Sequence, residues 1–258
     1  MLARPLFVDR NKKHLLLRLL ILLPVTALGN KKHRFIKAIH MKIIKRIMLL
    51  FSLFFFCAAI NAQEADNPHS ASLAAVRAGN LTKLKDLIEN RGANINSRNR
   101  PGESLLLMSI KAGNKEMINY LLEKGANIET ANTSKVTPLM AAAYAGDVDT
   151  LEKLLVRGAD VHAIDQLKKS AMVYAAGNGH TQVVTRLIAA GVDVNARYKS
   201  ELTALMWAAG SGHTQTAALL LEKGADASLL DDRGKTAYQM AEDAGHLEVK
   251  KLLEQRAK

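Results

Sequence analysis

The sequence predicts an all-α solenoid, built from about six helix–turn–helix units that are joined by short hairpin-like turns. Three series of residues recur at the same interval of 33, one of serine or threonine and two of glycine. They are Ser104, Thr137, Ser170, Thr203 and Thr236; Gly113, Gly146, Gly179, Gly212 and Gly245; and Gly125, Gly158, Gly191 and Gly224. A fixed period of this length indicates stacked repeats, each too small to bury its apolar face alone.

The repeat divides the later part of the chain into units of one domain. The domain is expected to span residues 70–258, after a short linker at 63–69. The expected units are 70–98, 99–131, 132–164, 165–197, 198–230 and 231–258. Because every unit packs on its neighbours, we expect no domain boundary inside the array.

The first half of each unit predicts a short helix with one apolar stripe. In the fifth unit, the Thr203 hydroxyl is placed to cap the first free N–H groups of a helix. Leu205, Ala208 and Ala209 then recur at helical spacing. Gly212 is expected to end this helix, because glycine adopts a positive φ at little cost.

The second half of each unit predicts another short helix and then a tight turn. Val184, Leu187 and Ile188 form its apolar stripe in the fourth unit. In the fifth unit a Gly-Ala-Asp step at 224–226 closes this helix, and the following segment DDRG at 231–234 has the composition of a tight turn. Helices of this length are marginal alone in water, so the units must stabilise one another.

The repeating sequence pattern resembles the ankyrin repeat. The resemblance rests on TPLMAAAYAGD at 137–147, followed by LLVRGADV at 154–161, and it covers nearly everything after the first 69 residues. In the last unit Glu254 stands where the preceding units carry an apolar residue, as expected of a terminal unit with a polar outer face.

Two departures from the family pattern concern the turns. The usual histidine after T-P-L is absent, and its place holds Leu107, Met140, Val173, Met206 and Gln239. The usual turn glycine is replaced by Lys135, Lys168 and Glu201 in the middle units. These three residues either keep the left-handed conformation, at about 1 kcal/mol each, or the middle turns have a different shape.

The formal charge of +12 lies in the leading part of the chain. Of the 36 Lys and Arg residues, twelve lie within residues 1–62 beside one acid, Asp9, which leaves 24 basic and 23 acidic residues in the remainder. A nearly neutral body gives no reason to expect phosphate binding, so no nucleic-acid partner is expected. The only cysteine, Cys57, also lies in the leading part, and the body therefore has no disulfide and no thiol nucleophile.

Residues 41–62 have the layout of a secretory signal peptide. Three basic residues precede an apolar run over 47–60, and small residues around Ala62 offer a cleavage point before Gln63. The run is shorter than the roughly 20 residues that span a bilayer, which favours cleavage over an uncleaved anchor. Residues 1–40 hold a second apolar segment, which we interpret as an upstream extension of the gene with synthesis starting at Met41. The alternative is a hydrophobic hairpin or an unusually long leader.

The resemblance implies a binding surface on the concave face of the array. Its candidate residues come from the turns and from the edge of the first helices. They are Arg100, Glu103, Lys111, Val136, Tyr144, Lys169, Tyr174, Lys199, Leu202 and Trp207. Tyr174 and Trp207 are expected to be partly exposed at its centre, while core packing explains part of each ring. Lys169 and Lys199 are expected to be exposed turn charges.

Three histidines, His180, His213 and His246, suggest a metal site as one hypothesis. The competing interpretation is that each begins the second helix of its unit. Stacked helices lie about 8–10 Å apart, whereas the ligands of one zinc ion all lie about 2 Å from it. We therefore expect no metal and no cofactor, and the chain also lacks a nucleophile elbow or a phosphate loop.

These observations predict a non-catalytic module that binds a partner protein through its concave face. The signal sequence predicts export, to a bacterial periplasm in the first instance, with membrane contact only through the leader before cleavage, and we expect a monomer. One alternative is a secreted effector that acts on a host or neighbouring cell. Another is a structural spacer tethered to the membrane by an uncleaved leader.

Overall fold

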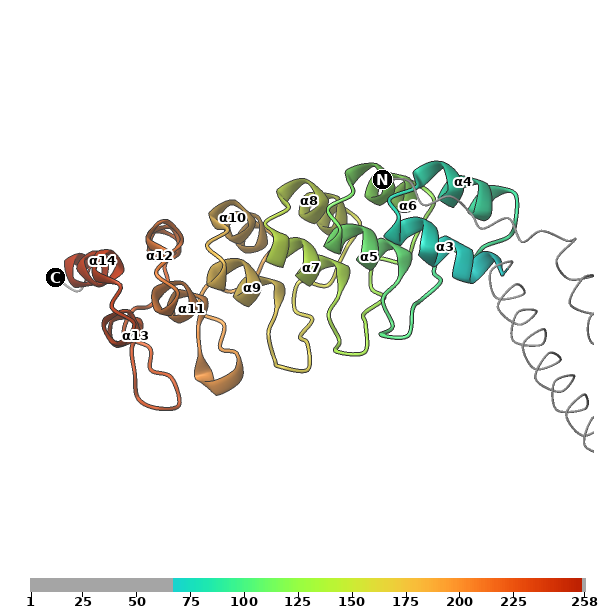
Figure 1. The fold of residues 1–258 in the computed structure, drawn as a ribbon. Coiled ribbons are helices and arrows are strands. Elements are labelled where there is room, and N and C mark those ends of the chain that lie inside the picture. Colours follow the sequence, from blue (N-terminus) through green and yellow to red (C-terminus); the bar gives the residue numbers. More distant parts are fainter. Residues whose placement is uncertain (1–66, 257–258) are drawn as a thin grey trace, which may run out of the picture. The chain divides into compact units, whose positions relative to one another are not determined.

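The computed structural model describes residues 67–256, which form one stack of paired α-helices (Figure 1). The first helices of the six pairs are α3 (Pro68–Arg77), α5 (Leu105–Lys111), α7 (Pro138–Ala145), α9 (Ala171–Gly177), α11 (Ala204–Gly210) and α13 (Ala237–Asp243). The second helices are α4 (Leu81–Glu89), α6 (Lys115–Glu123), α8 (Val148–Val156), α10 (Thr181–Ala189), α12 (Thr214–Glu222) and α14 (Leu247–Arg256). The expected all-α solenoid is confirmed.

The leading part of the chain is not among these residues. The expected extension at 1–40, the expected signal peptide at 41–62 and Cys57 all lie outside the described residues. The first helix begins at Pro68, with the Asn67 side chain accepting a hydrogen bond from the backbone of His69, so the array starts two residues before the expected boundary at residue 70. Within 67–256, none of the helices combines the length and the hydropathy needed to cross a membrane.

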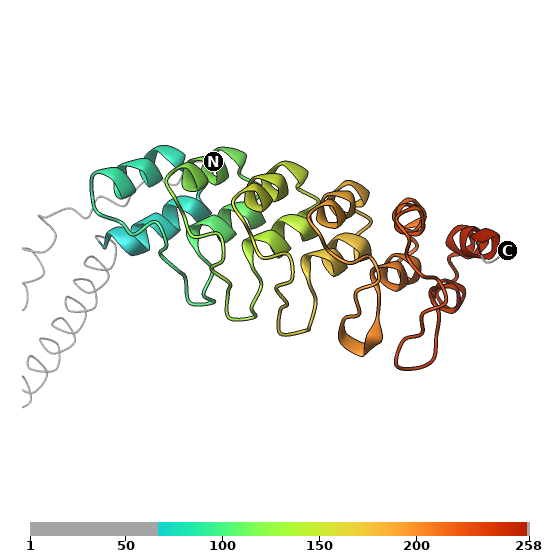
Figure 2. The same cartoon turned by 180° about the vertical axis from the view of Figure 1, so that it is seen from behind.

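The helices pack in two rows, with a hairpin projecting between each pair and the next (Figures 1 and 2). The first helices contact one another from α3 through α5, α7, α9 and α11 to α13. Alanines at the contacts, such as Ala142, Ala175 and Ala208, are fully buried and let the helices approach closely. We call the surface lined by the first helices and the hairpins the concave face.

The helix boundaries have the caps that the sequence predicts. The hydroxyl of each repeating serine or threonine accepts a hydrogen bond from the backbone N–H three residues later, as Thr137 does from Met140 at 3.2 Å. Gly146 follows α7 with φ 69°, the left-handed conformation that glycine adopts without strain. The periodic residues therefore act locally, by fixing where each helix starts and stops.

Five hairpins share one backbone frame, and we number them by unit from the second to the sixth. In the third hairpin the N–H of Asn132 donates to the carbonyl of Val136, and the N–H of Lys135 donates to the carbonyl of Asn132. The same two bonds recur in the others. Lys135 and Lys168 have φ 61° and Glu201 has φ 59°, so these residues keep the left-handed conformation and the alternative of reshaped frames is wrong.

An asparagine or aspartate side chain at the first position supports four of these hairpins. Asp165 Oδ1 accepts hydrogen bonds from the backbone N–H groups of Leu167 at 2.8 Å and Lys169 at 2.9 Å. Asn132 and Asp231 accept the same two bonds. Asn99 accepts only the bond from Glu103, because Pro101 has no backbone N–H to donate. These side chains satisfy backbone amides within each hairpin.

Candidate functional site

Two hollows lie side by side along the concave face, between the second and the fifth units. The first, which we call the Tyr144 groove, has a volume of about 350 Å³. It is lined by Lys111, Asn132, Val136, Met140, Ala141, Tyr144, Ala145 and Tyr174. The second, which we call the hairpin cleft, has a volume of about 300 Å³. It is lined by Leu167, Lys168, Lys169, Val173, Tyr198, Lys199, Ser200, Leu202 and Trp207.

Tyr174 on α9 is held rigidly between the two hollows. Its hydroxyl donates a 2.5 Å hydrogen bond to Asp165 Oδ2, the same buried carboxylate that organises the fourth hairpin. Burial and this hydrogen bond both raise the pKa of Tyr174 above its ordinary value near 10. The Tyr144 ring meets it edge to face, with ring centroids 5.8 Å apart. Tyr144 is 60% exposed, so it offers an aromatic surface backed by a fixed ring.

Lys169 joins this tyrosine pair to Trp207. Its Nζ lies 5.7 Å from the centre of the Tyr174 ring and 4.8 Å from the centre of the Trp207 ring. The expectation that Lys169 is simply an exposed turn charge is therefore wrong, because its stem is half-buried against two aromatic rings. We call Tyr144, Tyr174, Lys169 and Trp207 the aromatic cluster.

The ten residues expected at the site fall into distinct places. Eight line the two hollows: Lys111, Val136, Tyr144, Lys169, Tyr174, Lys199, Leu202 and Trp207. Glu103 lies beside them through an ion pair of 2.5 Å with Lys111, and the hydrogen bond from that lysine lowers the pKa of Glu103. Arg100 is exposed on the second hairpin and lines neither hollow.

Sequence reasoning missed several residues that complete the hollows. Leu167, Lys168, Tyr198 and Ser200 belong to the hairpin cleft, and Leu167 is 56% exposed. A signal for Tyr198 was present in the sequence, because the first turn position reads Asn99, Asn132, Asp165, Tyr198 and Asp231. Tyr198 is the one residue in this series that is neither asparagine nor aspartate, and it marks the fifth hairpin as different.

The three histidines are explained by packing. His180 and His213 stand at the cap positions of α10 and α12, and their Nε2 atoms lie 2.9 Å from the carbonyl oxygen of Tyr144 and 3.0 Å from that of Gly177. His246 packs in the same way, because a Cβ added at Gly212 would lie 2.7 Å from its Nδ1. Within residues 67–256, no three His, Cys, Asp or Glu side chains converge to hold a metal ion.

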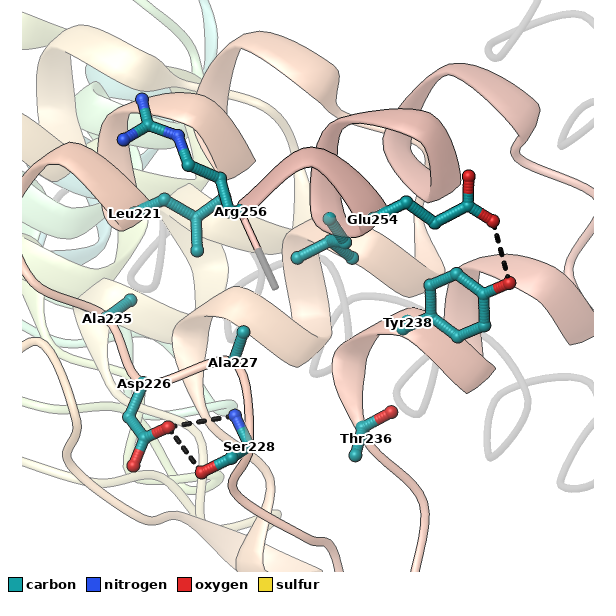
Figure 3. A pocket seen from close by; sticks show the side chains of 10 residues that line it. Leu221, Ala225, Asp226, Ala227, Ser228, Thr236, Tyr238, Glu254 and Arg256 are labelled. Atoms are coloured by element: carbon teal, nitrogen blue, oxygen red, sulfur yellow. Dashed lines mark hydrogen bonds between the residues drawn. The ribbon is translucent and has the colours of Figure 1, made fainter. Parts of the chain in front are cut away.

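A further hollow of about 970 Å³ lies at the last two units (Figure 3). Four of its polar side chains, Tyr238, Glu254, Asp226 and Ser228, pair with one another. The Tyr238 hydroxyl donates to Glu254 at 2.9 Å, and hydrogen bonds from Ser228 lower the pKa of Asp226. The aromatic cluster, with its exposed Tyr144 ring, therefore remains the better candidate for a binding site.

Comparison with known proteins agrees with this architecture. The family model described as ankyrin repeats, in three copies, matches residues 72–165 and again residues 172–258. No protein of curated function matches the sequence. Ankyrin repeats generally serve as modules for protein–protein interaction. The 33-residue period, the paired helices and a family match over most of the chain together show that this chain belongs to the ankyrin-repeat family.

Proposed function

We propose that this chain is a non-catalytic adaptor that binds a partner protein through the concave face, centred on the aromatic cluster. The observation that carries the proposal is the arrangement of Tyr144, Tyr174 and Lys169 between two adjacent hollows. Interface energy concentrates in aromatic anchors that are surrounded by polar groups. Tyr144 is such an anchor, because its ring is exposed while its position is fixed by Tyr174 and Asp165.

Rigidity of the anchor supports binding without a large entropic cost. Tyr174 is fixed by its hydroxyl bond to Asp165, and Lys169 lies over both Tyr174 and Trp207. A partner that covers these rings would not need to freeze them. The groove beside Tyr144 also has an apolar floor, formed by Val136, Met140 and Ala141, which can receive a partner's side chain.

The binding proposal is tested by capturing partners with two single variants. Tyr144→Ala removes the exposed ring and should weaken capture about thirtyfold, which corresponds to about 2 kcal/mol for a good anchor. Val156→Ala on α8 is the matched control, because Val156 is 87% exposed and lies on a second helix, away from the concave face. A partner that binds wild type and Val156→Ala but not Tyr144→Ala supports the site. Equal capture by all three proteins would place the interface elsewhere.

We also propose that the protein is exported from a bacterial cell, acts as a monomer and works in the periplasm. The proposal of export rests on the basic, apolar and small-residue succession at 41–62. Intact-mass measurement of the native protein tests it, with a mature chain expected to begin near Gln63. A mature chain that retains residues 54–56 would contradict cleavage and favour the membrane-tethered spacer.

The secreted effector is the second candidate for the same export signal. Cell fractionation separates the two, since an effector would be found in the medium or in a target cell. A protein retained between the membranes would support the periplasmic adaptor.

A further inference from the structure

The fifth hairpin, at residues 198–202, departs from the other four because Tyr198 occupies its first position. A tyrosine side chain cannot supply the short carbonyl or carboxylate oxygen that Asp165 offers to its turn amides. Tyr198 is instead half-buried beside the fourth hairpin, and burial raises its pKa. The fifth turn thus has the shared backbone frame without its usual side-chain support.

Two backbone consequences follow in the same hairpin. Ser200 and Glu201 both have a positive φ, 61° and 59°, whereas each other hairpin has one such residue. Two consecutive left-handed residues that are not glycine cost about 1 kcal/mol each. The turn is also irregular enough that Lys199–Glu201 forms a short 3-10 segment, η1. The missing aspartate is therefore accompanied by local strain.

The fifth hairpin also loses a hydrogen bond to its neighbour. Elsewhere, the second residue of a hairpin donates its N–H to the third residue of the preceding hairpin: Thr133 to Pro101 at 2.9 Å, Gln166 to Ser134 at 3.0 Å and Asp232 to Ser200 at 3.1 Å. Among the described residues, the equivalent bond from Lys199 to Leu167 is absent. The hairpin cleft lies between these two hairpins, where the bond is missing.

Three lysines surround the hairpin cleft without an acid among its lining residues. Lys168, Lys169 and Lys199 line it, and no ion pair of residues 67–256 includes any of them. The nearby carboxylate of Glu201 is paired with Arg197 at 2.9 Å. This edge of a nearly neutral array is therefore locally positive, which favours a negatively charged ligand.

The same cleft offers apolar surface. Leu167, at the tip of the fourth hairpin, is 56% exposed, and Val173 and Leu202 line the cleft below it. An apolar side chain of a ligand would cover this surface and remove it from water.

We propose that the hairpin cleft binds an acidic polypeptide segment, which places one apolar side chain between the fourth and fifth hairpins and its carboxylates against Lys168, Lys169 and Lys199. This inference rests on the proposed protein-binding function and specifies the chemistry of the partner. Binding covers Leu167 and neutralises the unpaired lysines. Tyr198, which replaces the asparagine or aspartate of the other hairpins, is the positioning residue that keeps the cleft open.

A single-stranded nucleic acid is the competing polyanion, and the geometry disfavours it. Base recognition without sequence reading depends on free aromatic faces for stacking. Lys169 lies over the Trp207 ring, and a Cβ added at Gly177 would lie only 3.6 Å from Cε3 of that ring. Little of the indole is left for a base, whereas an aliphatic side chain needs only the lining formed by Leu167, Val173 and Leu202.

The experiment uses the purified full chain and its own fluorescence. Trp207 is the only tryptophan of the sequence, and so its emission reports on the cleft alone. The probes are a random copolymer of glutamate and tyrosine, a copolymer of lysine and tyrosine, and an oligothymidylate. We expect the acidic copolymer to shift the Trp207 emission in a saturable manner that weakens as salt is added, and the other two to leave it unchanged.

Paired charge reversals then locate the binding. Lys168→Glu with Lys199→Glu should weaken the acidic copolymer at least tenfold, while urea unfolding stays within about 0.5 kcal/mol of wild type. Arg100→Glu with Lys135→Glu is the matched control, because it makes the same change of net charge on the second and third hairpins, outside the cleft. This control pair should change the affinity less than threefold.

Tyr198→Asp provides the third variant. It restores the regular first residue without touching a lysine, and it should weaken the acidic copolymer by closing the cleft. Absence of acidic copolymer binding, equal loss in both charge-reversed pairs, or binding of oligothymidylate as tight as that of the copolymer would each overturn the inference. The proposed function would survive that result if partner capture still depended on Tyr144.

Discussion

The four regular hairpins and the fifth hairpin have the same backbone frame. They differ in the side chain at the first position and in the contact with the preceding hairpin. In the fourth hairpin, Asp165 bonds two turn amides and the Tyr174 hydroxyl, so that one buried carboxylate supports both the turn and the aromatic cluster. In the fifth hairpin Tyr198 provides none of this, the bond to the preceding hairpin is missing and a cleft lies at the gap. The comparison indicates that the loss of the first-position asparagine or aspartate goes together with the loss of the bond to the preceding hairpin.

The largest effect is expected from Asp165→Ala, which makes a regular hairpin resemble the fifth. The change leaves the amides of Leu167 and Lys169 and the Tyr174 hydroxyl without their acceptor. We expect a loss of about 2 to 4 kcal/mol in the free energy of unfolding, measured with urea. Asp165→Asn is the control, since asparagine serves at this position in the second and third hairpins, and it should cost less than about 1 kcal/mol. Equal losses would show that the turn amides do not need the side-chain oxygen.

The second prediction separates the tyrosine held by the fourth hairpin from the tyrosine of the fifth. Because the folded pKa of Tyr174 is raised, the folded state keeps its proton after the unfolded chain loses it. The contribution of Tyr174 to stability is therefore complete below about pH 10 and is lost as the pH rises above that value. Tyr174→Phe should cost about 1.5 kcal/mol at neutral pH, through the lost hydrogen bond, and should reduce the alkaline decline measured by urea unfolding.

Tyr198→Phe is the comparison for that variant. The pKa of Tyr198 is raised by burial, but a hydrogen bond with Ser170 opposes the rise, so its removal should reduce the alkaline decline by less. Part of the decline should remain in both variants, since burial raises the pKa of Tyr120 to about 12. A greater reduction with Tyr198→Phe than with Tyr174→Phe would contradict the account of the two environments.

The third and smallest effect concerns strain in the fifth turn. Ser200→Gly relieves a positive φ that no other hairpin has at this position, and it should stabilise the protein by about 1 kcal/mol in urea unfolding. Ser134→Gly, at the equivalent place of a regular hairpin, should be neutral or destabilising, because φ there is not positive. Stabilisation by both changes would mean that the gain is unrelated to the left-handed conformation of Ser200.

The sequence predicts the helices and their caps because these depend on local chemistry. In the third unit, Thr137 caps α7 and Gly146 ends it. Both effects depend on the residue and its own backbone, and not on the neighbouring units. The left-handed conformation of Lys135 and Lys168 was one of the two alternatives that the sequence left open for the middle turns. The helix starts, helix ends and turn positions, which repeat every 33 residues, could thus be assigned from one unit to the next.

The details of the candidate site depend on contacts between units, which the period does not encode. That Tyr144 meets Tyr174 edge to face, and that Lys169 covers two rings, follows from side-chain rotamers and from the offset of adjacent helices. The cleft depends on a hydrogen bond that one hairpin fails to make. The sequence therefore predicted which residues lie on the concave face, but not which of them contact one another.

Amide hydrogen exchange, followed by NMR residue by residue, tests the central claim most directly, because the regular hairpins serve as internal standards. In the folded protein the amides of Thr133, Gln166 and Asp232 donate hydrogen bonds to the preceding hairpin, while Lys199 at the equivalent place does not. We predict that Lys199 exchanges at least about tenfold faster than those three amides. In Tyr198→Asp its exchange should slow toward theirs. Protection of Lys199 equal to that of Gln166 in the wild-type protein would contradict the open cleft and the role assigned to Tyr198.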